Sequence, residues 1–313
     1  MQLLNTKHTV ETANITEIGN FNIAANSQSF RILSDNLYSD KVTAVLRELS
    51  CNALDSHKQA GQTRPYEIHL PSVFEPTFSI RDFGVGLSHE NVMNLFSTYF
   101  SSTKSGSNDL IGGFGLGSKT PFSYTDSFTV ISCFNGIKST YNAFIGANDF
   151  PQIAKLCEEP TTEGNGVEIE FAVKQNDFNE FADKLSRVVR YFDIKPIVNG
   201  NSRYNPKDID YSLDKGFWKI RKSHSYSSGR SCNIIMGGVA YPVNFDLSGH
   251  AAKQTKFIQE ILNSPFDIFA EVGSVSVNPS REALNYREND IKYIIDVLSK
   301  IEKQITEEVK NSY

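Results

Sequence analysis

Three short segments of this 313-residue chain carry side chains that could bind a nucleotide and its metal ion. The first contains Glu48, Asn52 and Asp55, the second places Asp82 before two glycines, and the third is the glycine-rich run 112–117. An amide and a carboxylate can hold Mg²⁺ and a water, an acid in a tight turn can contact a base, and a row of backbone amides can bind phosphate. Each segment is a weak signal alone, so the order of the three is the informative feature.

The first segment is predicted to lie on one helix. Apolar residues recur at steps of three and four between Asp40 and Gln59, which is the pattern of an amphipathic helix. Glu48, Asn52 and Asp55 stand at i, i+4 and i+7, so they form a stripe beside the apolar one. This stripe could place the Asn52 amide on Mg²⁺ and the Glu48 carboxylate beside a reacting water. The alternative is an ordinary polar face in contact with solvent.

The second segment follows two predicted strands, 66–70 and 77–81. Asp82 comes directly after the second strand, and Gly84 and Gly86 let a flat ligand approach the backbone because they lack a Cβ. A carboxylate fixed in this turn can accept a hydrogen bond from an exocyclic amine, which would favour adenine over guanine. The alternative is a glycine turn with no ligand.

The third segment is predicted to bind phosphate. Ser118 and the residues after it indicate the start of a short helix, whose backbone amides and dipole would form an anion site. The spacing is neither that of the P-loop nor that of the dinucleotide-binding fingerprint. The predicted contacts are the consecutive residues Gly112, Gly113, Phe114, Gly115, Leu116 and Gly117.

A polar stretch rich in Ser, Thr, Asn and Gly separates the second segment from the third. A loop as long as 87–111 inside a compact domain is usually a lid or an insertion without fixed structure. Its place between two nucleotide-facing segments favours a lid. Lys104 and Lys119 could each pair with phosphate, although surface lysines are usually only solvated.

In this order and at these separations, the three segments resemble those of the GHKL superfamily of ATPases, which includes gyrase, Hsp90, histidine kinases and MutL. The resemblance implies a Bergerat fold: an α+β two-layer sandwich with a mixed sheet, followed by a smaller α/β transducer-like or middle domain. It also implies ATP and Mg²⁺ as ligands. Glu48 would act as the general base, Asn52 would hold Mg²⁺, and Asp82 would contact adenine.

Two further segments bear on this resemblance. Where gyrase, Hsp90 and MutL have a Gly-Thr pair before a strand, this chain has Gly164, Asn165 and Gly166. Asn165 therefore stands in the place of the threonine, or else the register differs by one residue. Residues 275–284 resemble the part of the Hsp90 middle domain that carries a catalytic arginine. This likeness implies that Arg281 would reach the γ-phosphate, while the alternative is an exposed arginine after a helix-capping serine.

A narrower resemblance extends over nearly the whole chain and concerns the phage rapid-lysis rII A family, whose members are membrane-associated factors of lysis timing and prophage exclusion. It rests on residues 100–104, 107–109, 117–126 and 279–284. Members of this family are considerably longer, so we expect a carboxyl-terminal part to be absent here. The resemblance implies a protein partner in the phage-infected cell.

Composition favours an enzyme-like chain of about two domains. The formal net charge of -5 disfavours a general nucleic-acid binder. No apolar run approaches the ~20 residues of a membrane span, and the amino terminus does not resemble a signal peptide, so we expect any membrane association to be peripheral. The four cysteines show no Cys-x-x-Cys spacing, which indicates free thiols in a reducing cytoplasm, and the six scattered histidines indicate no zinc site.

The remaining pattern predicts two domains, 1–200 and 201–313. A helix is expected over 178–192 and a long amphipathic helix over 288–309. Pro196 and the Asn-Gly-Asn at 199–201 mark the predicted boundary. Further strands are expected over 127–134, 138–145, 152–157, 167–173, 218–221, 232–236 and 239–243, with two short ones within 266–277.

The hypothesis from the sequence is ATP binding with slow, Mg²⁺-dependent hydrolysis. The lid would close over ATP, Arg281 would reach the phosphates, and the association of two domains or two protomers would change. A homodimer would form through the lid or the amino-terminal segment. Two alternatives stay open: a nucleotide-switched binding module without hydrolysis, and a DNA-transaction ATPase subunit of the gyrase or MutL type. A histidine kinase is disfavoured because no phospho-acceptor helix precedes the ATP-binding segments.

Overall fold

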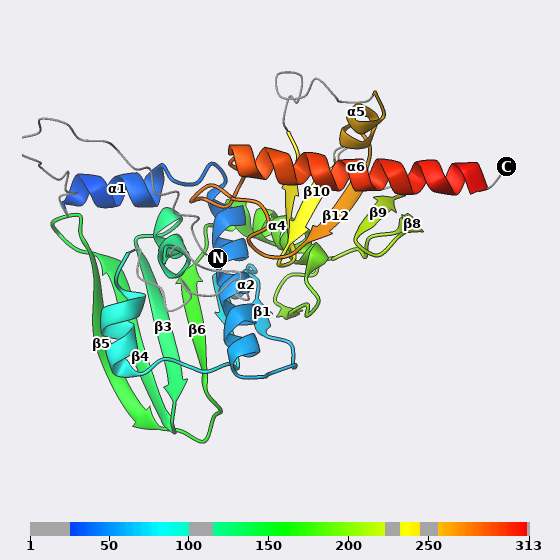
Figure 1. Ribbon diagram of the computed structural model, residues 1–313. Helices are drawn as coiled ribbons and strands as arrows, with labels where there is room; N and C mark the ends of the chain where they lie inside the picture. Colours follow the sequence, from blue (N-terminus) through cyan, green and yellow to red (C-terminus); the bar gives the residue numbers. More distant parts are fainter. Residues whose placement is uncertain (1–25, 100–114, 223–231, 245–255, 312–313) are drawn as a thin grey trace, which may run out of the picture.

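The computed structural model describes residues 26–99, 115–222, 232–244 and 256–311, which form two β-sheets with helices packed on them (Figure 1). The first sheet has seven strands in the order β5-β4-β3-β6-β2-β1-β7. Its neighbouring pairs are antiparallel except β1 with β7, so the sheet is mixed. The strands are β1 (Glu67–His69), β2 (Thr77–Arg81), β3 (Ser127–Phe134), β4 (Ile137–Ile145), β5 (Pro151–Pro160), β6 (Gly166–Ala172) and β7 (Ile197–Asn199).

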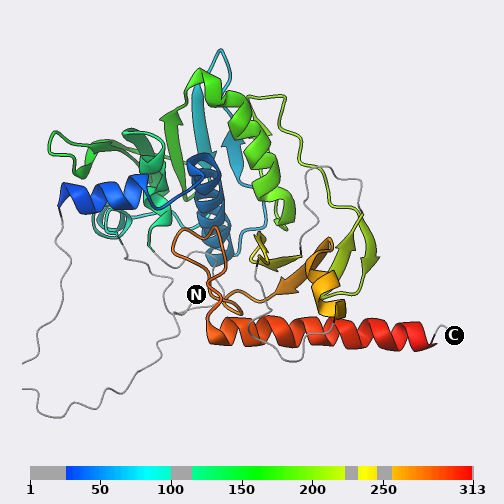
Figure 2. The same ribbon diagram turned by 90° about the horizontal axis from the view of Figure 1, so that it is seen from above.

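Helices α2 (Lys41–Gln59) and α4 (Phe178–Val188) pack on one face of this sheet (Figure 2). Phe181 of α4 contacts the rings of Phe78 in β2 and Phe171 in β6, at centroid distances of 5.5 and 6.2 Å. Burial of these aromatic side chains is a large favourable term for the layer. The shorter helical segments of this part are α1 (Ser27–Asp35), α3 (His89–Asn91), η1 (Val92–Phe96), η2 (Gly117–Ser123), η3 (Gln175–Asp177) and η4 (Val189–Tyr191).

Helix α2 begins at a side-chain cap. The Asp40 carboxylate accepts hydrogen bonds from the backbone N–H and the hydroxyl of Thr43, at 3.0 and 2.7 Å. After the helix ends, Gly61 adopts a φ of +64°, which a residue without Cβ tolerates best. All residues from Ala44 to Cys51 are buried, so the central turns of α2 lie inside the molecule, including their charged side chains.

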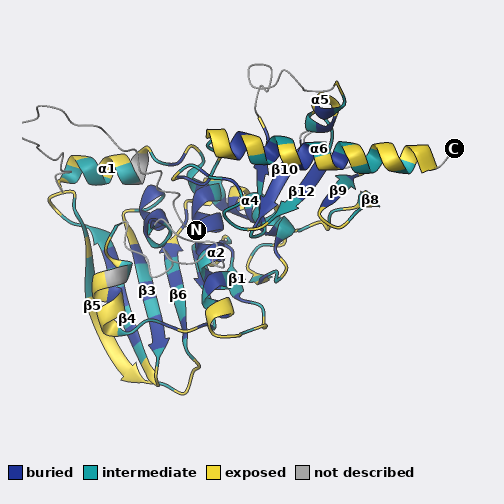
Figure 3. Ribbon diagram, in the orientation of Figure 1, coloured by how far each residue is buried: buried dark blue, intermediate teal, exposed yellow. Residues whose placement is uncertain are grey.

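The second sheet has five strands in the order β11-β10-β12-β9-β8, with β10 and β12 parallel. The long helix α6 (Glu288–Asn311) packs on it with a buried stripe and exposes its other side (Figure 3). Trp218 of β9 is fully buried, and its Nε1 donates to Gln304 of α6 at 2.9 Å. The other elements are β8 (Tyr211–Asp214), β9 (Trp218–Arg221), β10 (Asn233–Met236), β11 (Val239–Pro242), α5 (Lys256–Leu262) and β12 (Phe266–Ala270).

A buried carboxylate joins the two sheets. Asp267 of β12 accepts hydrogen bonds from Tyr191 and Tyr211, at 2.8 and 3.2 Å. Its other oxygen accepts one from Asn233 at 3.0 Å and lies 3.4 Å from Arg221. Tyr191 belongs to η4, beside the first sheet, whereas the other partners come from the second sheet. Because a buried charge must keep its partners, this cluster fixes one part of the chain against the other.

The mixed α+β class is confirmed, and β2, β3 and β9 begin and end where the sequence predicted. The sequence did not predict α1, α5, η3, β7 or β8. Strands β7 and β8 have three and four residues, too few for an alternating pattern to be recognised. Of the two short strands expected within 266–277, β12 is present, whereas Val277 forms only an isolated bridge with Leu284.

The expectation of one long loop over 87–111 is wrong for its first part. His89–Asn91 form α3 and Val92–Phe96 continue it as a π-helical turn. The Ser88 hydroxyl caps this segment by accepting the Asn91 N–H at 3.2 Å, and Val92 is buried. Residues 100–111 lie outside the described ranges. Within the described ranges, no helix is both long enough and apolar enough to cross a bilayer.

Candidate functional site

A polar stripe on α2 is the centre of the candidate site. Glu48 and Asn52 lie one turn apart, and Ser56 follows one turn later. A Cβ built on Gly117 would lie 2.9 Å from Glu48 Oε2 and 3.2 Å from Asn52 Nδ2. The last residue of the glycine run therefore lies directly against the two side chains that the sequence assigned to the base and the Mg²⁺ ligand.

The Asp82 turn lies against the same stripe. The Ser56 hydroxyl donates to Asp82 Oδ1 at 3.0 Å, and the Gly84 N–H donates to the same oxygen at 2.9 Å. Both of these bonds are made to Oδ1, and the backbone of Val167 also stabilises the charged carboxylate. The side chain is only 8% exposed, and burial raises the pKa of Asp82 to about 6 although the bonds to Gly84 and Ser56 oppose the shift.

The glycines of this turn allow close approach. A Cβ on Gly84 would lie 2.1 Å from Ser56 Oγ and 2.5 Å from the Ser56 carbonyl. Gly86 has a φ of +70°, and a Cβ there would lie 2.3 Å from the carbonyl oxygen of Cys133. Both glycines are therefore required for packing of the turn itself, between α2 and β3.

Arg281 reaches Glu48 across 233 positions of sequence. Its Nη1 donates to Glu48 Oε2 at 3.1 Å, while Arg47 Nε lies 3.4 Å from Glu48 Oε1. Arg47 also donates to the carbonyl oxygen of Ser280 at 2.7 Å. All of these side chains are buried, and Arg281 has a φ of +57°, an uncommon conformation for a residue with a Cβ. The candidate base thus carries an ion pair with two guanidinium groups.

Lys119 lies in η2 and is buried. Its Nζ donates to the Gly115 carbonyl at 3.1 Å and lies 6.0 and 5.9 Å from the ring centroids of Phe96 and Tyr99. Burial lowers the pKa of Lys119 to about 8. The amine is therefore held beside the glycine run, and it carries most of its charge at pH 7.

The remaining predicted residues are placed differently. Asp55 is buried on α2, and Leu116 is buried next to Gly117. The Asn165 side chain accepts the backbone N–H of Asn135 at 3.0 Å, in the turn between β3 and β4. Together with Phe83 and the predicted Gly84, it lines a hollow of about 430 Å³. Lys104, Gly112, Gly113 and Phe114 lie outside the described residues.

Three residues next to the site were missed by sequence reasoning. Ser56 continues the stripe at i+8 from Glu48, so the same periodicity could have included it. His57 Nε2 accepts the Phe83 N–H at 2.7 Å. The Glu282 carboxylate accepts the backbone N–H groups of Ser39 and Asp40, with shortest distances of 3.0 and 3.2 Å. No local signal points to the last two, because their partners are distant in sequence.

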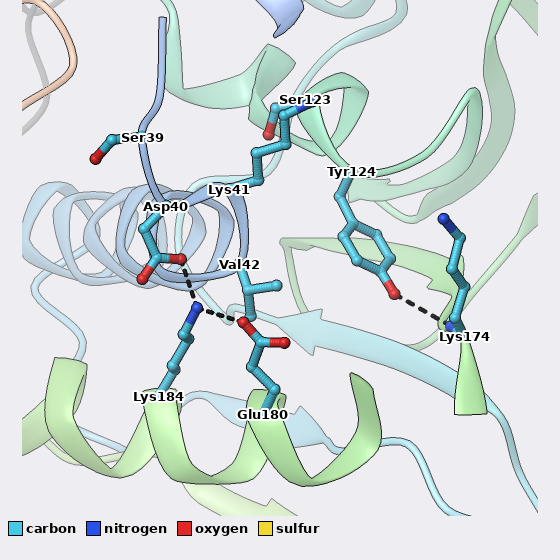
Figure 4. Close-up of a pocket in the computed structure, with 9 residues that line it drawn as sticks. All are labelled: Ser39, Asp40, Lys41, Val42, Ser123, Tyr124, Lys174, Glu180 and Lys184. Carbon is cyan, nitrogen blue, oxygen red and sulfur yellow. Dashed lines mark hydrogen bonds and ion pairs between the residues drawn. The ribbon is translucent and has the colours of Figure 1, made fainter. Parts of the chain in front are cut away.

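A separate hollow of about 570 Å³ opens where α2 begins, between α2 and α4 (Figure 4). Lys184 points between Asp40, at 2.7 Å, and Glu180, so acidic side chains neutralise its charge. The hydroxyl of Tyr124 accepts the backbone N–H of Lys174 at 3.1 Å. None of the predicted site residues lines this hollow, and we assign it no role.

Comparison with models of known protein families gives no match, and a search of curated protein sequences finds no relative.

Proposed function

We propose that the chain is an ATP-binding protein of the GHKL type that hydrolyses ATP slowly with Mg²⁺. The observation that carries the proposal is the convergence on α2: its polar stripe lies against Gly117 beside Glu48 and Asn52, and against Asp82 beside Ser56. Three segments separated by long stretches of sequence therefore share one face of one helix. Such a face could bind phosphates near Asn52 and a base near Asp82.

Recognition of the nucleobase would depend on Asp82. One oxygen of its carboxylate is held by Ser56 and Gly84, and Oδ2 would accept a hydrogen bond from a ligand. The exocyclic amine of adenine is such a donor, whereas guanine presents a carbonyl oxygen at the corresponding position. The buried carboxylate would therefore favour ATP over GTP.

The phosphate end fits Mg²⁺ because Gly117 has no Cβ to fill the space beside Glu48 and Asn52. Asn52 would hold the ion through its amide oxygen, and phosphate oxygens and waters would complete the coordination. Within the described ranges no group of three His, Cys, Asp or Glu side chains could hold a metal. When bound, Mg²⁺ would neutralise charge on the phosphates.

Glu48 would accept a proton from the attacking water. Arg281 at 3.1 Å and Arg47 at 3.4 Å occupy the two oxygens of the carboxylate. Release of Glu48 by Arg281, which would then face the γ-phosphate, is the step we propose before hydrolysis. This requirement would make turnover slow.

Glu48→Ala tests the proposal. We expect ATP affinity, measured by calorimetry, to stay within about threefold, because the general base Glu48 would act on the attacking water and would not bind ATP itself. Phosphate release should fall by about 10²–10⁴-fold, the usual contribution of a general base. Glu90→Ala, at an exposed position of α3, is the matched control. Unchanged turnover by Glu48→Ala, or no ATP binding by the unaltered chain, would overturn the proposal.

A nucleotide-switched module without hydrolysis is the second candidate. It is favoured by the pairing of both Glu48 oxygens with guanidinium groups. Phosphate release at high protein concentration separates the candidates, because the module would bind ATP with no turnover above background. By the likeness to the phage rapid-lysis rII A family, nucleotide state would then control association with a second protomer or a protein partner. Oligomer mass with and without a non-hydrolysable ATP analogue measures the first of these.

A further inference from the structure

The Asp82 turn is held by two adjacent residues of α2. The Phe83 N–H donates to His57 Nε2 at 2.7 Å, and the Val85 N–H donates to Ser56 Oγ at 3.2 Å. The same Ser56 hydroxyl donates to Asp82 Oδ1 at 3.0 Å. Two successive side chains of one helix thus bind alternate backbone amides of the turn and one oxygen of its carboxylate.

This arrangement determines which carboxylate oxygen is available. Gly84 and Ser56 both donate to Oδ1 of Asp82, which prevents the carboxylate from rotating freely. Oδ2 keeps its capacity to accept a bond. If the turn moved relative to α2, Oδ1 would lose the Ser56 donor, and only the Gly84 N–H would hold the carboxylate.

The acceptor role of His57 requires one tautomer. Because Nε2 accepts the Phe83 N–H, the proton of the neutral imidazole must lie on Nδ1. Burial lowers the pKa of His57, and the nearby Arg64 cation lowers it further, whereas the backbone of Arg64 opposes the shift. The rings of Tyr66 and Phe83 border the imidazole at 6.3 and 6.2 Å. Its surroundings favour the neutral form that can accept a hydrogen bond.

We infer that Ser56 and His57 are positioning residues that set the base specificity of the nucleotide site by fixing the Asp82 carboxylate in one orientation. This inference rests on the proposed ATP site and deepens it. Neither residue needs to touch the nucleotide. Their effect would be confined to binding of the base, so phosphate chemistry at saturating ATP should not depend on them.

His57→Leu removes the acceptor, and His57→Gln keeps one, because the Gln Oε1 can replace Nε2. For the Leu variant we expect the Kd for ATP to rise about tenfold, the scale of one lost hydrogen bond, and the preference for ATP over GTP to fall. The kcat at saturating ATP should stay within about twofold. His57→Gln should recover most of the affinity and preference. His89→Gln, at an exposed position of α3, is the control.

Ser56→Ala gives a second test if the Leu variant does not fold, as judged by circular dichroism. It should lower the ATP preference in the same way. Nitrogen-15 NMR of the unaltered chain should show His57 protonated on Nδ1, independently of any nucleotide. If the unaltered chain binds ATP but both variants keep its affinity and preference, or if His57 is protonated on Nε2, the inference is wrong and the proposed function stands. If the unaltered chain binds neither nucleotide, the proposed function fails.

Discussion

At the scale of single residues, Asp82 shows how a binding group can lower stability. The carboxyl is buried and its pKa is raised from 3.8 to about 6. A group whose folded pKa is raised favours the folded state below its unfolded pKa, and this contribution is lost as pH rises through the folded value. At neutral pH the folded protein therefore bears the cost of a charged, buried carboxylate.

Asp82→Asn should stabilise the fold and abolish ATP binding. The amide can keep the bonds from Ser56 and Gly84 without the buried charge, so at pH 7.5 the free energy of unfolding should rise by up to about 3 kcal/mol. This figure is the difference between a pKa of about 6 and one of 3.8, converted at 1.36 kcal/mol for each pKa unit. The gain should disappear near pH 4. Urea unfolding at both pH values, with exposed Asp126→Asn as control, measures it. A less stable variant at pH 7.5 would contradict the raised pKa.

Gly117→Ala tests the space beside Glu48 and Asn52. The added Cβ would lie 2.9 Å from a carboxylate oxygen and 3.2 Å from an amide nitrogen, so both side chains must shift. We expect a loss of at least about tenfold in ATP turnover, since catalytic groups tolerate little displacement, with a small change in melting temperature. Gly164→Ala is the control because a Cβ there meets nothing within 4 Å. Equal turnover in both variants would rule out the close packing of Gly117 against Glu48 and Asn52.

At the scale of elements, α2 receives contacts from the loop before α6 at several points. Arg281 pairs with Glu48, Ser280 accepts a hydrogen bond from Arg47, and Glu282 binds the two amides that precede the helix. A single loop therefore contacts both the start of α2 and its polar stripe. Any movement of this loop would change the position of Arg281. It would at the same time change the protection of the backbone amides of residues 39 and 40 against hydrogen exchange.

Glu282→Ala should weaken the packing of the loop before α6 against the start of α2. Loss of a carboxylate that accepts two backbone N–H groups should raise hydrogen exchange at Ser39 and Asp40 by about tenfold or more, the scale of charge-assisted hydrogen bonds. Hydrogen-exchange mass spectrometry of peptides covering 36–42 and 276–285 measures the change, and exposed Glu271→Ala is the control. Unchanged protection in both peptides would show that Glu282 does not hold the loop.

At the scale of the whole molecule, the Asp267 cluster makes the two sheets interdependent. Its carboxylate is 0% exposed and binds Tyr191 from the first part and Tyr211, Asn233 and Arg221 from the second. Removing one partner from a buried charge costs more than an ordinary hydrogen bond. The two parts should therefore unfold together.

Tyr191→Phe removes the bond from the first part and keeps the ring. We expect a loss of about 1–3 kcal/mol in the free energy of unfolding, with ATP affinity unchanged because the cluster does not touch the α2 stripe. Unfolding followed by tyrosine fluorescence and by circular dichroism should coincide in the unaltered chain. Tyr204→Phe is the control. Two separate transitions in the unaltered chain would contradict coupling of the sheets.

Local patterns were enough to predict several elements and the types of the candidate site residues. The helix over 40–59 was predicted to within one residue, and β2 was predicted with its observed bounds, because the periodicity of a single element depends only on nearby residues. The same periodicity placed Glu48 and Asn52 on one stripe. The capping residues Asn26 and Ser29 of α1 were also present in the sequence, but its apolar pattern was too short to reveal the helix.

Contacts between distant segments were decided only by the tertiary structure. Whether Arg281 meets Glu48, and whether His57 meets the Asp82 turn, depends on how the sheet, α2 and the loop before α6 pack. Side-chain types and order therefore determined which groups this protein has for chemistry. Packing determined which of them meet, because the free energy of each pairing depends on burial and geometry that no short stretch of sequence contains.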